Sequence, residues 1–145
     1  MIFVGTFEHA MDKKGRLVLP SKFRNQLEPT STYASPGFGQ CVALWPEESY
    51  AGYLQRITEQ VRSGDTQQHK LLRRMTSESA QLRPDAQGRV LLPENLLTWG
   101  NLQRDVVLVG ALDRIEIWDK AAWEADSADS TTELMEVLEL SLIHI

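Results

Sequence analysis

The spacing of apolar and polar positions predicts a strand, a tight turn, a second strand and a short helix at the start of the chain. Residues 6–11 and 16–19 are rich in strand formers and flank a polar four-residue turn, so they predict a β-hairpin. Pro20 stops the second strand because it has no N–H to donate. Residues 21–27 then show the pattern of a short helix.

Longer elements follow this start. After a loop, the apolar run 41–45 predicts a strand. Apolar residues at helical spacing predict a helix from Pro46 as far as Gly64. A second helix is expected over 67–80, where it joins the two halves of the chain.

The second half repeats this order of elements. Its expected elements are a turn at 85–88, a short helix over 93–99, strands over 106–109 and 115–118, and a helix that Asp119 caps. Small and polar residues over 126–132 predict a break in that helix before a last amphipathic segment.

The repetition extends to the residues themselves. Residues 12–20, DKKGRLVLP, recur as residues 85–93, DAQGRVLLP, at a shift of 85 − 12 = 73 residues. The same shift carries Gly37 onto Gly110 and the pair 44–45 onto 117–118. One supersecondary unit has therefore been duplicated. Because units of about seventy residues have marginal cores, the two copies should pack on each other.

Each copy has an aspartate and a glycine that a turn needs, and an arginine that it does not. The turn residues are Asp12 and Gly15 in the first copy and Asp85 and Gly88 in the second. A β-ribbon with basic residues fits DNA, because cations neutralise phosphates and an arginine fork can read guanine in the major groove. The residues expected to bind DNA are Lys13, Lys14, Arg16, Lys22, Arg24 and Arg89. The first five are expected to form one positive patch on the first hairpin and the helix that follows it.

The charge is divided unevenly along the chain. The net charge is −5, but residues 1–73 carry 9 − 7 = +2 and residues 74–145 carry 6 − 13 = −7. One face is therefore expected to meet an anion. With 42% hydrophobic residues and no long apolar run, the composition predicts a cytoplasmic globular protein without a membrane segment.

The candidates for catalysis or metal binding are weak. His9, His69 and His144 have no metal-ligand spacing and no neighbouring nucleophile. Cys41, the only cysteine, lies in an apolar run and is expected to be a core residue. We therefore expect no cofactor, no metal and no enzymatic activity.

The doubled Asp-x-x-x-Arg-hydrophobic-x-hydrophobic-Pro motif, with a hydrophobic-Trp strand end and a helix after each copy, resembles the MraZ family of bacterial regulators. The resemblance implies an α+β fold of two tandem AbrB-like units, whose swapped hairpins form an interlocked, β-barrel-like core flanked by helices. It also implies a ring-like homo-oligomer, associated with the nucleoid, that binds direct repeats upstream of cell-division and cell-wall genes. The arginines that contact DNA in the family correspond to Arg16 and Arg89.

The resemblance and the repeat together suggest boundaries for the units. The first unit is expected over 1–66, a connecting helix over 67–80, the second unit over 81–126 and a C-terminal segment over 127–145. In the second copy, Ala86 and Gln87 replace the two lysines of the first. Equal binding by the two copies is therefore not expected.

A protein-binding module, such as an AbrB-like antitoxin, is the alternative function. Its partner surface would be acidic and would lie near the end of the chain, at Asp126, Asp129, Glu133, Glu136 and Glu139. A solvated helix face explains the same residues. An antitoxin of this kind usually has one motif copy and a disordered tail, whereas this chain has two copies.

Overall fold

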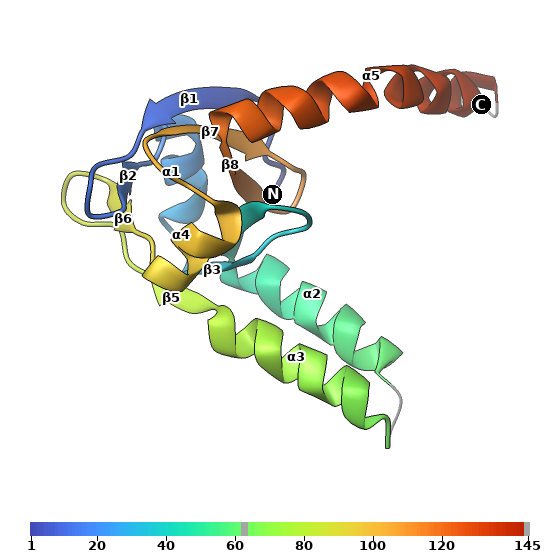
Figure 1. Ribbon diagram of the computed structural model, residues 1–145, viewed down its shortest axis with the longest axis horizontal. Coiled ribbons are helices and arrows are strands. Elements are labelled where there is room, and N and C mark those ends of the chain that lie inside the picture. The colour runs from blue at the N-terminus through green and yellow to red at the C-terminus, as the bar shows by residue number, and fades with distance from the viewer. Residues whose placement is uncertain (62–63, 144–145) are drawn as a thin grey trace.

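The computed structural model describes residues 1–61 and 64–143 and shows an α+β fold (Figure 1). In chain order the elements are β1 (Thr6–Ala10), β2 (Arg16–Val18), α1 (Ser21–Leu27), β3 (Thr32–Pro36), β4 (Cys41–Pro46), α2 (Glu47–Gln60), α3 (Thr66–Glu78), β5 (Ala80–Leu82), β6 (Arg89–Leu91), α4 (Glu94–Gly100), β7 (Asp105–Gly110), β8 (Ile115–Asp119) and α5 (Lys120–Ile143). The expected mixed fold class is confirmed.

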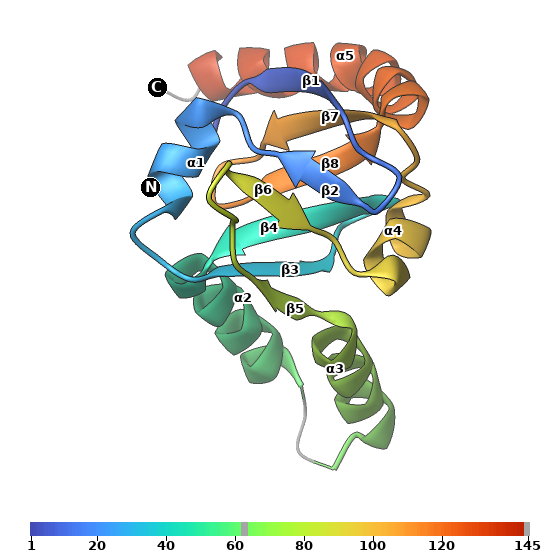
Figure 2. The same ribbon diagram turned by 90° about the vertical axis from the view of Figure 1, so that its left-hand side faces the viewer.

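Six strands form one sheet in the order β1-β7-β8-β4-β3-β5, and β2 and β6 form a separate two-stranded ribbon. Figure 2 shows this ribbon lying in front of the sheet. The sheet is open, since β1 and β5 are its two edges and do not pair with each other. The β-barrel-like core is therefore wrong for the part of the chain that the structure describes.

The expected hairpin of residues 6–11 and 16–19 is also wrong. Its turn is closed by backbone bonds from the Asp12 amide to the Arg16 carbonyl at 3.0 Å and from the Gly15 amide to the Asp12 carbonyl at 3.1 Å. Beyond the turn the two strands diverge, because each pairs with a strand of the second half of the chain: β1 pairs with β7, and β2 pairs with β6. Each half therefore provides strands that pair with strands of the other half, both in the sheet and in the ribbon.

The pairing of the ribbon relates equivalent residues of the two halves. Leu17 pairs with Val90, and 17 + 73 = 90, so a pseudo-twofold axis passes between β2 and β6. Ala43 pairs with Glu116 in the sheet, and 43 + 73 = 116. The helices follow the same shift: α1 and α4 begin at 21 and 94, and α2 and α5 begin at 47 and 120.

Strands β3 and β7 depart from this shift by one residue. Thr32 pairs with Pro46, and Val106 pairs with Asp119, which is the repeat equivalent of Pro46. Thr32 therefore corresponds to Val106, at a shift of 106 − 32 = 74 residues. Pro36 therefore occupies the ladder position of Gly110, and the match of Gly37 with Gly110 holds only in the sequence. The domain boundaries remain a prediction, since strands from both halves share one sheet.

The main hydrophobic core fills the space between the sheet and the ribbon. Leu17 and Val90 of the ribbon and Ile115 of the sheet are fully buried there, together with Phe23 of α1 and Leu96 of α4. Burying each side chain of this size contributes about 1.5–3 kcal/mol. The other face of the sheet carries two smaller clusters, one under α5 and one under α2 and α3.

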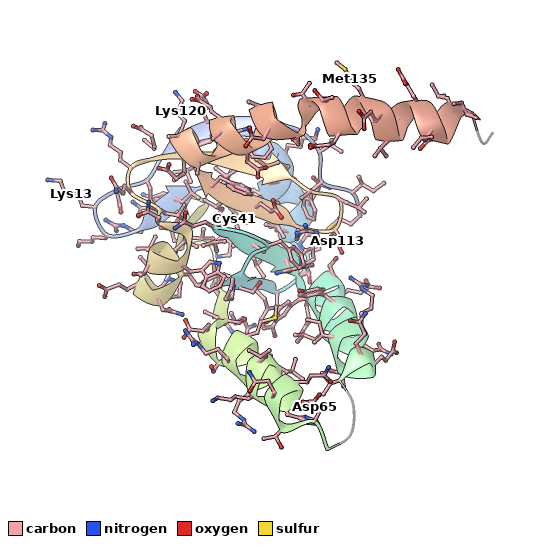
Figure 3. All side chains as sticks on the ribbon, turned by 45° about the vertical axis from the view of Figure 1, so that its right-hand side comes forward. Lys13, Cys41, Asp65, Asp113, Lys120 and Met135 are labelled. Carbon is pink, nitrogen blue, oxygen red and sulfur yellow. The ribbon has the colours of Figure 1, made fainter. Side chains whose placement is uncertain are left out.

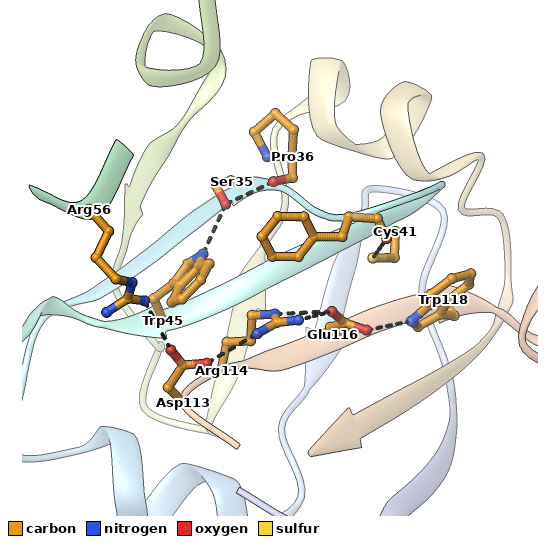
Figure 4. Close-up of polar contacts among 10 residues, drawn as sticks. Ser35, Pro36, Cys41, Trp45, Arg56, Asp113, Arg114, Glu116 and Trp118 are labelled. Carbon is orange, nitrogen blue, oxygen red and sulfur yellow. Dashed lines mark hydrogen bonds and ion pairs between the residues drawn. The ribbon is translucent and has the colours of Figure 1, made fainter. Parts of the chain in front are cut away.

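A polar network crosses that second face at β8 (Figure 4). Arg114 donates from Nε to Glu116 Oε2 at 3.0 Å, and Trp118 donates from Nε1 to Glu116 Oε1 at 3.1 Å. The Arg114 guanidinium also lies 4.8 Å from the centre of the Phe38 ring. Because Glu116 is buried, its negative charge would destabilise the fold without these hydrogen-bonding partners.

Cys41 lies beside this network and is fully buried, as expected for a core residue. Its thiol donates to the Phe38 carbonyl at 3.3 Å. Burial, with the charge of Glu116 nearby, raises the pKa of the thiol to about 12. The side chain is therefore a protonated packing group and not a nucleophile.

Two elements differ from their sequence predictions at the middle of the chain. The expected loop before residue 41 contains β3, whose Thr32 and Ser35 are buried polar residues that conceal the strand pattern. Ser35 is satisfied there because its hydroxyl accepts from Trp45 Nε1 at 2.9 Å. The connecting helix ends at Glu78 rather than 80, since β5 starts at Ala80 and pairs with β3.

The helix boundaries also differ. Helix α2 ends at Gln60, and residues 62–63 of its predicted extension lie outside the described residues. Helix α5 runs without a break from Lys120 to Ile143. Ser127, Ser130 and Thr131 are compatible with the helix because their hydroxyls donate hydrogen bonds to carbonyls three or four residues earlier. Asp119 caps α5 as predicted, with its carboxylate accepting from the Ala122 amide at 3.1 Å.

The ribbon core can be tested with adjacent residues of β2. Leu17→Ala should lower the free energy of unfolding by about 2–5 kcal/mol, because Leu17 is fully buried at the pseudo-twofold axis. Val18→Ala is the matched control, since Val18 is 44% exposed and should change stability by about 0.5 kcal/mol or less. Urea unfolding measures both. Equal losses in the two variants would contradict the burial of the ribbon.

Candidate nucleic-acid interface

The two copies of the repeated motif form two loops on one side of the molecule. We define the first loop as residues 12–16 and the second loop as residues 85–89. In Figure 1 both loops project from the left-hand side, away from α2, α3 and the far end of α5. In Figure 2, which faces that side, the loops flank the β2–β6 ribbon. A long partner lying across this face can therefore meet both loops.

The aspartate organises the first loop through both of its carboxylate oxygens. Asp12 Oδ1 accepts from the amides of Lys14 and Arg16, each at 2.9 Å. Asp12 Oδ2 accepts from Arg16 Nε at 2.7 Å. Gly15 has φ = +85°, a left-handed conformation that is strained for other residues. The loop is thus closed by its own side chain and backbone.

The second loop has the same geometry. Asp85 Oδ1 accepts from the amides of Gln87 and Arg89, each at 2.9 Å, and Asp85 Oδ2 accepts from Arg89 Nε at 2.8 Å. Gly88 has φ = +76°. The two motifs therefore fold alike despite the change of Lys13 and Lys14 to alanine and glutamine.

This geometry fixes each arginine and leaves its outer end available. The bond from Nε to aspartate orients the guanidinium, and within the described part of the chain no partner is shown for Nη1 and Nη2 of Arg16 or Arg89. The two side chains are about one third exposed, at 35% and 33%. Two free N–H groups at a fixed orientation match the paired acceptors of guanine or phosphate.

The same contacts lower the pKa values of both aspartates. For Asp12 the bond from the Arg16 amide is the largest cause, and the bond from the Arg16 side chain adds to it. For Asp85 the Arg89 amide has the same role. Both carboxyls are therefore ionised at neutral pH.

Each loop rests on the short helix of the opposite half. A Cβ built on Gly88 would lie 2.7 Å from Nη1 of Arg24, and one built on Gly15 would lie 2.9 Å from Cδ1 of Leu97. Arg24 and Leu97 are equivalent positions of the repeat, since 24 + 73 = 97. Arg24 therefore lies beside the second loop. The expected grouping of Arg24 with the cations of the first loop is wrong.

The other sequence-predicted cations stay with the first half. Lys13 and Lys14 are exposed at the tip of the first loop, and Lys13 points into solvent in Figure 3. Lys22 is exposed in the first turn of α1. The structure therefore separates the predicted cations into three places: the first loop, the start of α1 and the second loop.

Two further arginines lie beside the loops without any motif to reveal them. Arg104 and Lys13 line a hollow of about 690 Å³ next to the first loop, and the Arg104 carbonyl accepts from the Met11 amide at 2.7 Å. Arg83 is exposed two residues before Asp85. Arg104 is far from the first loop in sequence, so only the pairing of β1 with β7 brings it there.

The surroundings of the second loop are more acidic. Arg83 and Pro84, which directly precede the second loop, line a hollow of about 450 Å³ together with Glu28 and Glu47. The first hollow has Asp12 as its only carboxylate and two cations beside it. The electrostatic potential should therefore favour an anion more strongly at the first loop.

The described residues give little support for a metal site or a membrane-spanning helix. No group of three or more His, Cys, Asp or Glu side chains within residues 1–61 and 64–143 is placed to hold a metal ion. His144 lies outside the residues that the structure describes. No described helix is long and apolar enough to cross a membrane.

Fold and site together define a tandem-repeat α+β protein with two arginine-bearing loops on one face. Sequence comparison agrees with this class. The family model for MraZ proteins, described as antitoxin-like, matches residues 2–73 and again 75–139. These two matches begin 75 − 2 = 73 residues apart, which is the shift of the repeat. The chain belongs to the MraZ family, as the doubled motif predicted.

Related proteins cover nearly the whole chain. A protein of Lachnoclostridium phytofermentans is 36% identical over 135 residues, which are 92% of each chain. A Nocardia farcinica protein is 35% identical over 97% of each chain, and one from Salinispora arenicola is 37% identical over 95% of this chain and 96% of its own. All three are named transcriptional regulator MraZ.

The role of Asp12 can be tested by changing the pH. A carboxyl with a lowered pKa stabilises the fold above its unfolded value of 3.8, and this contribution disappears as the pH falls through the lower folded pKa. Asp12→Asn should therefore reduce the free energy of unfolding at neutral pH, and the difference should shrink below pH 3.8. Urea unfolding over a pH series measures it.

Asp85→Asn is the matched variant, because the second loop has the same contacts. It should show the same dependence on pH. A loss of stability that stays constant from neutral pH to below 3.8 would show that the carboxylate charge is not what closes these loops.

Proposed function

We propose that this protein is a sequence-specific DNA-binding regulator of transcription that acts on the cell-division and cell-wall gene cluster. It binds direct repeats in the promoter of that cluster as an oligomer, in the cytoplasm and at the nucleoid. The observation that supports this most is the pair of aspartate-held arginines, Arg16 and Arg89, on one face. The names of the relatives point to the same role.

Within the first loop, the lysines would bind phosphates and the arginine would read base edges. Lys13 and Lys14 are exposed and flexible, so they suit phosphates, which tolerate varied geometry. Arg16 is held at Nε by Asp12 and so presents Nη1 and Nη2 in a fixed direction. A fixed guanidinium is what bidentate reading of guanine O6 and N7 requires, at about 1–3 kcal/mol of discrimination.

The second loop would bind less strongly. It lacks tip lysines, and Glu28 and Glu47 line the hollow beside the residues that precede it. Arg24 and Arg83 compensate in part, because they bring positive charge to its two sides. In this proposal the halves are AbrB-like units that keep the same scaffold and differ in how much DNA affinity each provides.

Oligomerisation would supply the remaining affinity. A single chain with net charge −5 is repelled by a duplex except where its basic loops reach the phosphates. When several chains are joined, each later contact becomes intramolecular, which raises avidity by roughly 10²- to 10⁴-fold if the spacing matches the DNA repeats.

The first test compares the two loop arginines. Arg16→Ala should weaken binding to the promoter repeats strongly, and Arg89→Ala should weaken it less. Both variants should keep the fold, because the bonds from each aspartate to the backbone amides still close the loop. Fluorescence anisotropy measures the affinity, and circular dichroism checks the fold.

Arg56→Ala is the control, because Arg56 is an exposed cation on α2, away from both loops, where it pairs with Asp113 at 3.6 Å. It should bind DNA like the natural chain. Unchanged affinity in Arg16→Ala, or equal losses in Arg16→Ala and Arg56→Ala, would refute the assigned role of the first loop.

The second test uses salt and repeat spacing. The logarithm of the binding constant should fall linearly with the logarithm of salt concentration, with a slope of about −0.9 per neutralised phosphate. Inserting half a helical turn between adjacent repeats should reduce affinity, because it rotates one repeat away from its loop. If the insertion had no effect, or if a partner protein rather than DNA bound stoichiometrically, the protein-binding alternative would be favoured.

A further inference from the structure

The far end of α5 is an apolar surface that no described residue of its own chain covers. We define the distal α5 segment as residues 133–143. Its seven large apolar side chains are 54–74% exposed: Leu134, Met135, Val137, Leu138, Leu140, Leu142 and Ile143. Figure 1 shows this segment projecting beyond the body, and Met135 points into solvent in Figure 3. A patch of this kind marks an interaction site.

The apolar side chains of the segment are spread around the helix axis, which is typical of a helix that is buried in its assembled state. At 100° per residue, Leu134, Leu138 and Leu142 fall together on one side. Glu139 borders that side, and Glu133 lies toward the opposite one. The segment holds three glutamates and no lysine or arginine, so its net charge is −3. Its partner must therefore be apolar in the centre and basic at the edge.

Such a surface exists on the opposite side of the molecule, next to α3. We call it the α3 hollow: a cavity of about 370 Å³ lined by Arg74 and Glu78, which form an ion pair at 3.4 Å, and by the apolar residues Phe38, Leu71 and Trp99. These three apolar side chains are each at least 44% exposed. Helix α3 carries Lys70, Arg73 and Arg74 against Glu78, a net charge of 3 − 1 = +2.

The repeat gives a second reason to match α5 with α3. Helices α2 and α5 occupy equivalent positions, since 47 + 73 = 120. Helix α2 has α3 beside it, with Met75 packed against the cluster of Tyr53 and Leu54. Helix α5 is the last described element, so no equivalent of α3 follows it in the described part of the chain.

The two surfaces cannot meet within one chain. Figures 1 and 2 both place α5 along the top of the molecule and α3 at the bottom. We propose that the distal α5 segment of one copy docks into the α3 hollow of a second copy. The proposal rests on the oligomer of the proposed function and names its contact surfaces. Because the two surfaces differ, the contact is heterologous and repeats from chain to chain.

Charge distinguishes this contact from the pairing of two α5 helices. Two distal α5 segments side by side would bring six glutamates together without a cation. Docking at α3 sets Glu139, which borders the leucine side, near the α3 cations Lys70, Arg73 and Arg74 instead. Burial of the apolar faces supplies the affinity, and the charges select the partner.

The closing experiment uses one variant of each surface in the full-length chain. Leu138→Asp removes the donor surface and Leu71→Asp removes the acceptor surface; both residues are more than half exposed, so both variants should keep the fold. Sedimentation velocity should show the natural chain as an oligomer and each variant as a monomer. Mixed in equal amounts, the two variants should form a heterodimer that grows no further, because only one intact contact remains.

Several results would overturn the proposal. If Leu71→Asp kept the natural size, α5 would pair with itself or with another surface. If the mixture formed no heterodimer, the two surfaces would not be complementary. Circular dichroism and thermal unfolding check that each variant is folded, and Asp129→Lys, an exposed change on α5 outside the segment, should leave the size unchanged.

A charge exchange provides an independent reading in case an aspartate disturbs packing. Glu139→Lys and Arg74→Glu should each weaken the oligomer, and an equal mixture of the two variants should recover part of the assembly. No recovery would refute the role of the charges. Both leave the first and second loops intact, so binding to a short duplex with one site reports the proposed function separately from the assembly.

Discussion

The pairing of β2 with β6 is the constraint on which the rest of the structure depends. It joins Leu17 to its own counterpart Val90, so the two halves of the chain must meet about a pseudo-twofold axis. Once they meet, the flanking strands β1 and β5 are drawn to opposite edges of one sheet. Both loops then emerge on the side of the ribbon, which is why a duplicated motif becomes a two-point surface.

Much of this fold could be predicted from the sequence, because the repeat and the apolar patterns are local signals. Helix α1 is where its pattern placed it, and α5 begins after the predicted cap at Asp119. Strand β3 was missed because Thr32 and Ser35 are polar, and the sequence does not reveal the bond from Trp45 that helps to satisfy the buried Ser35 hydroxyl. The exchange of strands between the halves leaves no local trace, so a simple hairpin was the natural but wrong expectation.

In the candidate site, too, local features could be predicted from the sequence and features set by tertiary contacts could not. The aspartate, glycine and arginine of each loop are visible in the motif because the turn that they form is local. Arg104 could not be found, since a strand pairing brings it to the first loop. Arg24 was found but placed at the wrong loop, because each short helix crosses to the opposite half.

The crossing of the short helices has a consequence for how such a chain could arise. A protein of half this length would hold its helix against the loop of a second, identical copy, so any change at position 24 would alter both loops at once. In a fused chain, positions 24 and 97 are separate residues, here Arg24 and Leu97. Covalent linkage of the halves therefore allows the two loops to have different surroundings, and a substitution beside one loop leaves the other unchanged.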